Sequence, residues 1–424
     1  MTAETSSPQP GAATAAASQS GTAASEAPPA TWRGIPRGIW VLGFVSLFMD
    51  VSSEMIHALL PIYLVTVLGT SMLTVGIIEG IAEATALVTK VVSGGISDWL
   101  GKRKLLTVVG YGLAALTKPV FPLAPTVGWL VAARFVDRIG KGIRGAPRDA
   151  LIADLAPPGL RGASFGLRQT LDTIGAFLGP LAAIALMAAT AGHFTLVFWV
   201  AVVPAVLAVA LLVFGIREPE RHAAAPARPR LRLADMRYLP AAFWRVVAVA
   251  GVLTLARFSE AFLLLRAQSV GLQPSLVPAV LVVMNVVYAL AAYPAGVMSD
   301  RVGRRGVLVA GIFMLIVADL ILALSTGLAG VTLGIAFWGL HMGFTQGLLA
   351  TLVADTAPVH LRGTAFGLFN LAGGIAMLAA SVIAGALWDA QGPQATFLAG
   401  AVFTILALVG FVLVGRRATA FPAK

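Results

Sequence analysis

The 424-residue chain contains no cysteine, which excludes disulfides and thiol chemistry. Charged residues are also scarce, at 12%, whereas soluble domains average about 25%. Hydrophobic residues make up 58% of the chain, and the mean hydropathy is +0.88. A soluble protein of this composition would need a core far larger than its polar surface could cover. The composition therefore indicates a protein with many membrane spans.

Several functional motifs are missing as well. No Gly-x-x-x-x-Gly-Lys-Ser/Thr phosphate loop is present, which argues against an ATP-driven pump, and there is no nucleophile elbow. The five histidines are too scattered to predict a metal site, and no cofactor is expected. The net charge of +11 comes from basic residues in short loops and along one helix, so nucleic acid is not an expected partner.

The N-terminal stretch differs from the rest of the chain. Residues 1–30 are rich in Ala, Ser, Thr, Gly and Pro and have no Lys or Arg. They lack the basic start and the apolar stretch of a secretory signal. We expect residues 1–34 to form a disordered cytoplasmic tail.

Two loop sequences occur twice, about half a chain length apart. GGISDWLGKRKLL from Gly94 matches GVMSDRVGRRGVL from Gly296, an offset of 202 residues. DLAPPGLRGASFGL from Asp154 matches DTAPVHLRGTAFGL from Asp355, an offset of 201 residues. The chain is therefore an internal duplication of a membrane unit. Such repeats are typical of transporters with two related halves and a pathway between them.

The hydrophobic pattern predicts an all-α polytopic protein with twelve transmembrane helices in two six-helix halves. The expected spans are 37–67, 73–97, 105–124, 127–154, 164–190, 194–215, 242–267, 276–298, 306–325, 329–355, 364–388 and 394–415. Lys and Arg gather in alternate loops, which places both termini in the cytoplasm by the positive-inside rule. The expected domains are the tail 1–34, a half at 35–216, a cytoplasmic linker at 217–241, a half at 242–415 and a tail at 416–424.

These features together resemble the major facilitator superfamily over about residues 36–415. The resemblance rests on the two six-helix halves, the basic central loop, and the Gly-x-x-x-Asp-x-x-Gly-basic-basic loop after helices two and eight. The stretches FMDVSSEMIHALLPIYL and DRIGKGIRGAPRDALIAD resemble a prokaryotic branch of that superfamily. The resemblance implies a secondary transporter in the cytoplasmic membrane of a prokaryote.

In the superfamily this repeated loop is implied to latch the two halves together. Asp98 would cap the start of helix eleven, and Arg103 would pair with Asp154, the acid that ends helix four. The alternative is that the basic residues only fix orientation. The residues expected in the latch are Gly94, Asp98, Gly101, Arg103, Asp154, Asp300, Gly303 and Arg304.

Helix five carries Gly166, Gly175 and the pair Gly179-Pro180. This spacing resembles the exporter-associated motif of the superfamily, which lets helix five bend and pack against helix eight. The alternative is an ordinary contact made by small residues. The motif favours export over uptake.

Helix four carries an unusual row of basic residues. Arg134, Arg138, Lys141, Arg144 and Arg148 fall within about 120° on a helix, so they form one stripe. A charge at the bilayer centre costs about 3 kcal/mol or more, so the stripe must face a wet cavity or paired acids. Arg144 and Arg148 could instead sit at the cytoplasmic interface. The stripe favours a substrate with an anionic group, held by Arg138.

Acidic residues lie on the neighbouring predicted helices. They could carry protons, or they could pair internally with the basic stripe. Arg168 and Asp172 are i, i+4 on helix five, and Ser259-Glu260 of helix seven repeats Ser53-Glu54 of helix one. The residues expected in the transport cavity and in proton coupling are Asp50, Glu54, His57, Glu79, Glu83, Arg134, Asp137, Arg138, Lys141, Arg257 and Glu260.

The sequence thus predicts a monomeric, proton-coupled exporter of a small molecule, in which the two halves rock around a midplane site. The expected partners are protons, a small-molecule substrate and the lipid bilayer. An uptake symporter is the first alternative, because the sequence barely separates it from an exporter. A polytopic membrane enzyme or sensor is the second, although no catalytic set is visible at either membrane face.

Topology can be checked with reporter fusions. A reporter fused after Gly69 should be outside the cell and one fused after Arg221 inside, because basic loops stay in the cytoplasm. Enzymatic reporters that are active on only one side of the membrane give the answer directly. If both fusions report the same side, the twelve-span topology is wrong.

Overall fold

The computed structural model describes residues 34–100, 102–157, 160–217, 233–358 and 361–417. Throughout these ranges the regular structure is helical, without strands. Helices are what an apolar chain must form in lipid, because each backbone N–H and C=O then finds its partner within the same segment. Eleven helical stretches in this part of the chain are long and apolar enough to cross a bilayer.

The N-terminal half contains eight helices in the described residues. They are α1 (Arg37–His57), α2 (Leu60–Thr66), α3 (Met72–Leu100), α4 (Arg103–Thr117), α5 (Val120–Leu123), α6 (Val127–Leu155), α7 (Arg161–Ala189) and α8 (Phe194–Gly215). The pairs α1–α2 and α4–α5 each form one interrupted span.

The C-terminal half repeats this order. It comprises the 3₁₀ turns η3 (Leu233–Tyr238) and η4 (Pro274–Leu276), and the helices α9 (Ala241–Ala256), α10 (Ala261–Ser269), α11 (Ala279–Val302), α12 (Arg304–Leu324), α13 (Leu328–Thr356), α14 (Arg362–Gln391) and α15 (Pro393–Arg417). Here α9 and α10 form one interrupted span.

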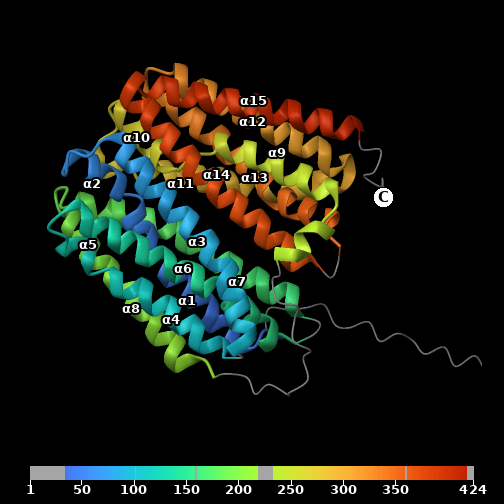
Figure 1. Cartoon of the computed structure of the whole chain (residues 1–424). Coiled ribbons are helices and arrows are strands. Elements are labelled where there is room, and N and C mark those ends of the chain that lie inside the picture. Colours follow the sequence, from blue (N-terminus) through green and yellow to red (C-terminus); the bar gives the residue numbers. More distant parts are fainter. Residues whose placement is uncertain (1–33, 101, 158–159, 218–232, 359–360, 418–424) are drawn as a thin grey trace, which may run out of the picture.

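The packing of the helices also repeats. In the first half α1 packs against α7 and α8, and α6 packs against α3 and α4. In the second half α9 packs against α14 and α15, and α13 packs against α11 and α12. The duplication seen in the loops therefore extends to the whole arrangement of each half. Between the halves, α3 lies along α14 and α7 contacts α11 (Figure 1).

Helix α6 is the twelfth long helix, although its composition alone does not qualify it as a span. Its charged side chains lower its hydropathy, but four of them, Arg134, Asp137, Arg138 and Arg144, are buried within the bundle rather than turned to lipid. Helices α3 and α4 cover it. A segment this polar crosses the bilayer only because its neighbours shield it.

The two halves are joined at one end of the bundle and separate at the other. We call the end where α3 begins and α14 ends the Asp389 end, and the opposite end, where α4 begins, the Arg103 end. One apolar cluster spans both halves, with Met55 and Phe198 from the first and Phe262 and Phe397 from the second. The two other clusters each belong to a single half, around Ile39 in one and around Phe243 in the other.

The shared cluster brings α2 of one half against α10 of the other at the Asp389 end (Figure 1). At the Arg103 end, each half instead keeps a core of its own. The halves are therefore closed against each other at the Asp389 end. The structure represents one of the two states that a rocking mechanism requires.

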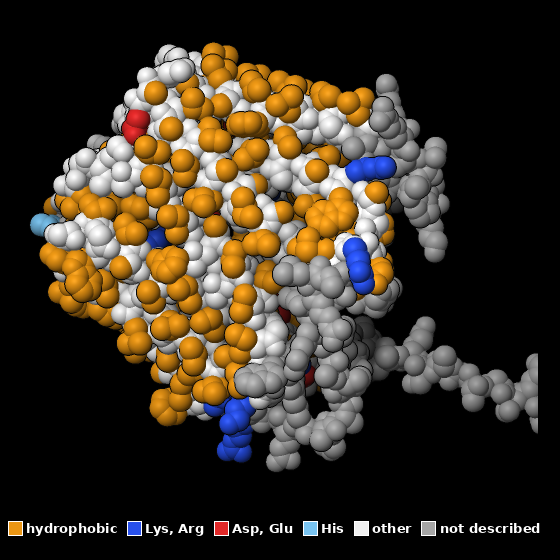
Figure 2. All heavy atoms as spheres, viewed as in Figure 1, with side chains coloured by type: hydrophobic (Ala, Val, Ile, Leu, Met, Phe, Trp, Pro, Cys, Tyr) orange, Lys and Arg blue, Asp and Glu red, His pale blue; other side chains and the backbone are white. Residues whose placement is uncertain are grey.

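The outer surface suits a lipid environment. Figure 2 shows hydrophobic side chains spread over one face of the bundle, with Lys and Arg near its margins. Leu116, Phe214, Leu290 and Ile375 are among the large apolar side chains left exposed. In a bilayer these groups contact acyl chains, so their exposure to the surroundings carries no hydrophobic penalty.

Candidate functional site

Two interrupted spans supply the centre of the site. Helix α1 ends at His57 and the chain resumes as α2 at Leu60, while α9 ends at Ala256 and resumes as α10 at Ala261. The second interruption exposes backbone groups inside the bundle. Ser259 satisfies part of them, since its N–H donates to Ser381 Oγ at 3.3 Å and its Oγ accepts the N–H of Ala261 at 3.2 Å. Broken spans of this kind are typical of transporter binding sites.

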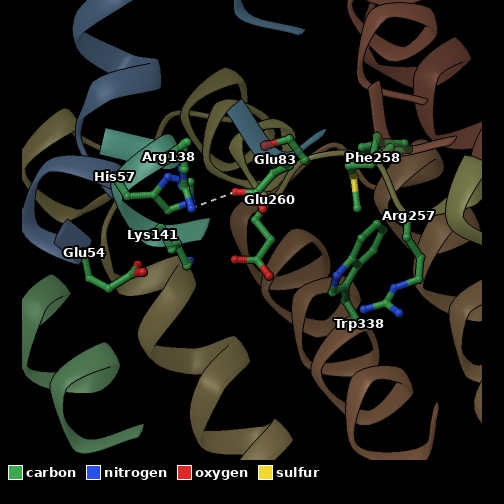
Figure 3. A pocket seen from close by; sticks show the side chains of 11 residues that line it. Glu54, His57, Glu83, Arg138, Lys141, Arg257, Phe258, Glu260 and Trp338 are labelled. Atoms are coloured by element: carbon green, nitrogen blue, oxygen red, sulfur yellow. Dashed lines mark ion pairs between the residues drawn. The ribbon is translucent and has the colours of Figure 1, made fainter. Parts of the chain in front are cut away.

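A cavity of about 310 Å³ lies between the two halves at these interruptions. The lining residues are Glu54, His57, Glu83, Arg138, Lys141, Arg257, Phe258, Ser259, Glu260, Trp338 and Met377. In Figure 3, Lys141 and Glu54 lie on one side, Arg257 and Trp338 lie on the other, and the carboxylate of Glu260 points into the space between them. The cavity is thus polar and charged, and both halves contribute to it.

Seven of the eleven residues predicted for the cavity line it, namely Glu54, His57, Glu83, Arg138, Lys141, Arg257 and Glu260. The other four predicted residues, Asp50, Glu79, Arg134 and Asp137, do not line this cavity. Each of these four lies behind the wall, in contact with another charged side chain. The physical reason is that charges at this depth are stabilised by a partner even where no water reaches them.

The wall behind His57 is a buried group of three side chains. Arg134 Nη2 donates to Glu79 Oε2 at 2.9 Å and to His57 Nδ1 at 2.5 Å. Arginine is always a donor, so His57 Nδ1 accepts and the imidazole is neutral in this arrangement. All three side chains are less than a tenth exposed. This group joins α1, α3 and α6.

Arg138 is already paired by the protein. Its Nη1 lies 3.0 Å from Glu83 Oε1, and both side chains face the cavity. Glu83 thus supplies one partner of Arg138, and the expectation that an anionic substrate binds Arg138 stays a prediction. Arg144 and Arg148 also turn away from the cavity. Arg144 lies over the ring of Tyr111 at 4.7 Å, and Arg148 Nη1 donates to Ser46 Oγ at 3.2 Å.

The unpaired charges of the cavity are a different set. In the described part of the chain, the side chains of Glu54, Lys141, Arg257 and Glu260 form no hydrogen bond or ion pair. Two come from the first half and two from the second. Glu260 nevertheless lies within electrostatic range of Glu54, Lys141 and Arg257.

An aromatic cluster borders the second half of the cavity. Phe258 contacts Trp338 at 5.6 Å between ring centroids and Phe397 at 5.4 Å. Phe258 and Trp338 line the cavity, as does Met377. None of the three was predicted from the sequence. Trp338 offered a signal, because it lies in the middle of an apolar run, away from the span ends where tryptophan is usual.

Lys118 is a buried charged residue that the sequence reasoning missed. It lies between α4 and α5 and is 2% exposed. Its Nζ donates to Asp137 Oδ1 at 2.9 Å and to Ser53 Oγ at 3.0 Å. The signal was a single lysine inside the predicted span 105–124. The pair fixes α6 to α1 and to the bend in the third span.

A pair of acids lies between α1 and α7, outside the cavity. Asp50 and Asp172 share a side-chain hydrogen bond. Arg168 lies 3.4 Å and Arg148 3.9 Å from Asp172. Two carboxyl groups can form such a bond only when one of them carries a proton. The arrangement can therefore hold a proton inside the first half.

The glycines of α7, which is the fifth expected span, allow α7 to approach α1 closely. A Cβ at Gly175 would lie 2.6 Å from the carbonyl oxygen of Leu47, and one at Gly179 would lie 2.6 Å from Cβ of Glu54. Gly175 and Gly179 themselves lie nearest to α1, whereas α7 as a whole contacts α11, the eighth expected span. Helix α7 continues without interruption through Pro180.

The predicted latch is described only in part. Arg103 forms an ion pair with Asp154, which joins the start of α4 to the end of α6. Gly303 has φ +90° between α11 and α12, a conformation that favours glycine. Gly94 faces Ala146 of α6 at an ordinary contact distance. Gly101 and the side chains of Asp98, Asp300 and Arg304 lie outside the described part of the structure.

Comparisons with known proteins agree on one family. A model of the Major Facilitator Superfamily matches residues 42–266 and 247–423. An uncharacterised MFS-type transporter of Methanocaldococcus jannaschii is 32% identical over 383 residues, which cover 88% of this chain and 94% of the relative. An uncharacterised protein of Mycobacterium tuberculosis is 29% identical over 358 residues, covering 83% and 87%.

Solved structures share the fold. A bacterial homologue of the human lysosomal transporter Spinster, in its inward-facing and unoccupied conformation, superposes with a TM-score of 0.72 at 15% identity. The match covers 89% of this chain and 96% of that one. A peptide-bound transporter of the POT family superposes with a TM-score of 0.75 at 14% identity, covering 91% and 97%.

The buried pair of Lys118 and Asp137 gives a test of the packing. Lys118→Met should lower the free energy of unfolding by about 3–5 kcal/mol, because it leaves the carboxylate of Asp137 buried without a partner. The double variant Lys118→Met/Asp137→Leu should recover most of that loss. Thermal denaturation of the purified protein in detergent measures both. Lys102→Met, at an exposed loop position, is the control. Equal losses in the single and double variants would contradict the assigned pairing.

Proposed function

Since the chain belongs to the major facilitator superfamily, it is a membrane transporter rather than an enzyme, and we propose that it exports a small molecule in exchange for protons. The cavity between the halves is the substrate site in this proposal. It suits alternating access because both halves line it at the interrupted spans α1–α2 and α9–α10.

The observation that carries proton coupling is the hydrogen bond between Asp50 and Asp172. Two arginines lie within 4 Å of this pair of acids, and both contact Asp172 rather than Asp50. In the described residues no cation lies within 4 Å of Asp50, so Asp50 is the member that donates. A proton held there lies one helical turn from Glu54, which lines the cavity. Asp50 is thus placed to take up or release a proton as the cavity changes.

The coupling requires a change in how α1 and α7 cross within the first half. Asp50 lies on α1 and Asp172 on α7, and both helices border the space between the halves. A change in their crossing would separate the two carboxyls, and each would then find its own partner or solvent. Loss of the shared hydrogen bond releases the proton. The proton and the substrate therefore alternate without direct contact.

Export is favoured over uptake by the series Gly166, Gly175 and Gly179-Pro180, which resembles the exporter-associated motif. The close approach at these glycines supports a role in coupling, because a Cβ at Gly175 would also lie 3.1 Å from Cβ of Asp50. We place the protein in the cytoplasmic membrane with both termini in the cytoplasm. The Arg103 end then faces the cytoplasm, and the described state is closed toward the outside.

Neutralising the proton site should separate transport from binding. In Asp50→Asn, proton-driven flux should fall by roughly ten-fold or more, because the amide of asparagine cannot bind the proton. Even one pK unit of lost proton affinity corresponds to a factor of ten. Substrate exchange without a gradient should persist. Proteoliposomes that contain a pH dye and an imposed pH gradient measure the first, and counterflow in the same vesicles measures the second.

Two results would redirect this proposal. If Asp50→Asn and Glu54→Gln both keep full gradient-driven transport, the carrier is elsewhere, and Glu83 and Glu260 are tested next. If the interior of wild-type vesicles becomes more acidic as substrate enters, instead of more alkaline, protons move with the substrate. The transporter is then an uptake symporter.

A further inference from the structure

We infer that the cavity selects amphoteric substrates, small molecules that carry one cationic and one anionic group on an apolar or aromatic body. This inference rests on the proposed function in taking the cavity as the substrate site. It differs from the expectation of an anionic substrate at Arg138, because Nη1 of Arg138 is already paired with Glu83.

The charge balance of the cavity leads to this class. Once Arg138 and Glu83 are paired, Lys141 and Arg257 remain as free cations, and Glu54 and Glu260 remain as free acids. A purely anionic ligand would satisfy the cations but face two unpaired carboxylates. A purely cationic ligand would pair with the acids but leave Lys141 and Arg257 without a partner. Only a ligand with both signs pairs the two sets without leaving a desolvated charge.

The position of these charges adds a link to transport. Each half supplies one cation and one acid, Lys141 and Glu54 from the first and Arg257 and Glu260 from the second. A ligand that pairs with charges on both sides therefore bridges the halves. Binding then stabilises an arrangement in which the halves lie close, as alternating access requires.

The remaining lining sets the size and the body of the ligand. A volume of about 310 Å³ lies at the small end of ligand cavities. Phe258, Trp338 and Met377 supply an apolar and aromatic surface on one side. Aromatic faces accommodate both an apolar ring and an ammonium group.

Matched compounds can test the class directly. We use three aromatic scaffolds that hold the amine and the carboxylate at different distances and orientations: tryptophan, 4-(aminomethyl)benzoate and phenylalanyl-phenylalanine. Each is compared with its N-acetylated anion and its carboxamide cation. Thermal stabilisation of the purified full-length protein, without any gradient, reports affinity. At least one amphoteric compound should bind, and its single-charge counterparts should bind roughly ten-fold more weakly, the scale of one charged hydrogen bond.

Variants assign the two charged groups of the ligand. Arg257→Gln should weaken the amphoteric compound and the anion but spare the cation, and Glu260→Gln should weaken the amphoteric compound and the cation but spare the anion. Lys102→Gln, in an exposed loop, is the control. Tighter binding of a single-charge compound in every scaffold, or no binding by any amphoteric compound, overturns the inference. Binding is measured without protons as driving force, so failure of proton coupling would leave this result untouched.

A second observation, independent of the cavity, concerns the closed end of the bundle. We propose that Asp389 is a latch for the state open at the Arg103 end. Both carboxylate oxygens of Asp389, at the end of α14, accept backbone N–H groups at the start of α3, from Met72 at 2.9 Å and from Leu73 at 2.8 Å. These residues come from different halves of the chain. The contact also satisfies two N–H groups that a helix start leaves free.

The helices touch closely around this contact. A Cβ at Gly76 would lie 2.1 Å from the carbonyl oxygen of Ser381, and one at Gly385 would lie 2.4 Å from that of Met72. The two backbones are thus in contact on α3 and α14 beside the Asp389 carboxylate. Such a crossing forms only while the halves are closed at this end, so the hydrogen bonds of Asp389 report and stabilise that state.

The two ends of this helix pair mirror each other. Helices α3 and α14 run in opposite directions, and the expected cytoplasmic latch has Asp98, at the end of α3, capping the start of α14. Asp389 at the end of α14 caps the start of α3. With Asp98 in its expected place, each helix would end in an acid at the start of the other. Rocking opens one contact as it closes the other, which makes the two acids competing latches.

Spin-label distances can test this latch, and the absence of native cysteine makes labelling simple. The pair Val67→Cys and Gln394→Cys spans the halves at the Asp389 end, and Lys102→Cys with Arg305→Cys spans them at the Arg103 end. With Asp389→Asn added, the population separated at the Asp389 end should rise roughly five-fold, the scale of one charge at a helix start. The Arg103-end pair should move closer in the same proportion.

The second label pair distinguishes switching from local damage. Asp149→Asn, at the opposite end of the bundle, is the control and should leave both distances as they are. Asp389→Glu, which keeps the charge, should retain the closed population. Unchanged distances in Asp389→Asn overturn the proposal, and so does separation at the Asp389 end without approach at the other.

Discussion

Charge held at membrane depth is the constraint on which the rest of this bundle depends. The basic residues of α6 cannot face lipid, so the first half is organised around their partners. Arg134 contacts Glu79 and His57, and Arg138 forms an ion pair with Glu83. The guanidinium of Arg144 lies over the ring of Tyr111. These contacts come from α1, α3 and α4. The stripe thereby determines which faces of those helices turn inward.

Much of the architecture could be predicted from the sequence because it depends on chemistry that repeats along the chain. The apolar runs gave the spans, and the duplicated loops gave the two halves. The stripe on α6 followed from helical spacing alone. The interruption after Ala256 could not be predicted in this way, since no proline or glycine marks it. It exists because side chains from other helices, Ser381 among them, satisfy the freed backbone.

Which side chain each charged residue of the site contacts also could not be predicted from the sequence. Spacing shows which residues share a face but not which neighbour each meets. Arg138 was expected to hold a substrate and already meets Glu83, while Asp137 meets Lys118, a residue that the pattern of acids and bases did not single out. The approach of Asp172 to Asp50 depends on how closely α7 crosses α1. That distance is decided by Gly175 and Gly179, whose partner helix was expected to be another one.

The helix-for-helix repetition of the packing has an evolutionary consequence. An ancestral homodimer of the six-helix unit would have placed two identical copies of α6 around one cavity. Two such stripes would repel each other across a weakly screened space. The helix that now occupies the corresponding place, α13, presents Trp338 there instead of a row of arginines. The two halves therefore differ at this place, where a cationic stripe on α6 faces a cavity whose other side carries an aromatic side chain of α13.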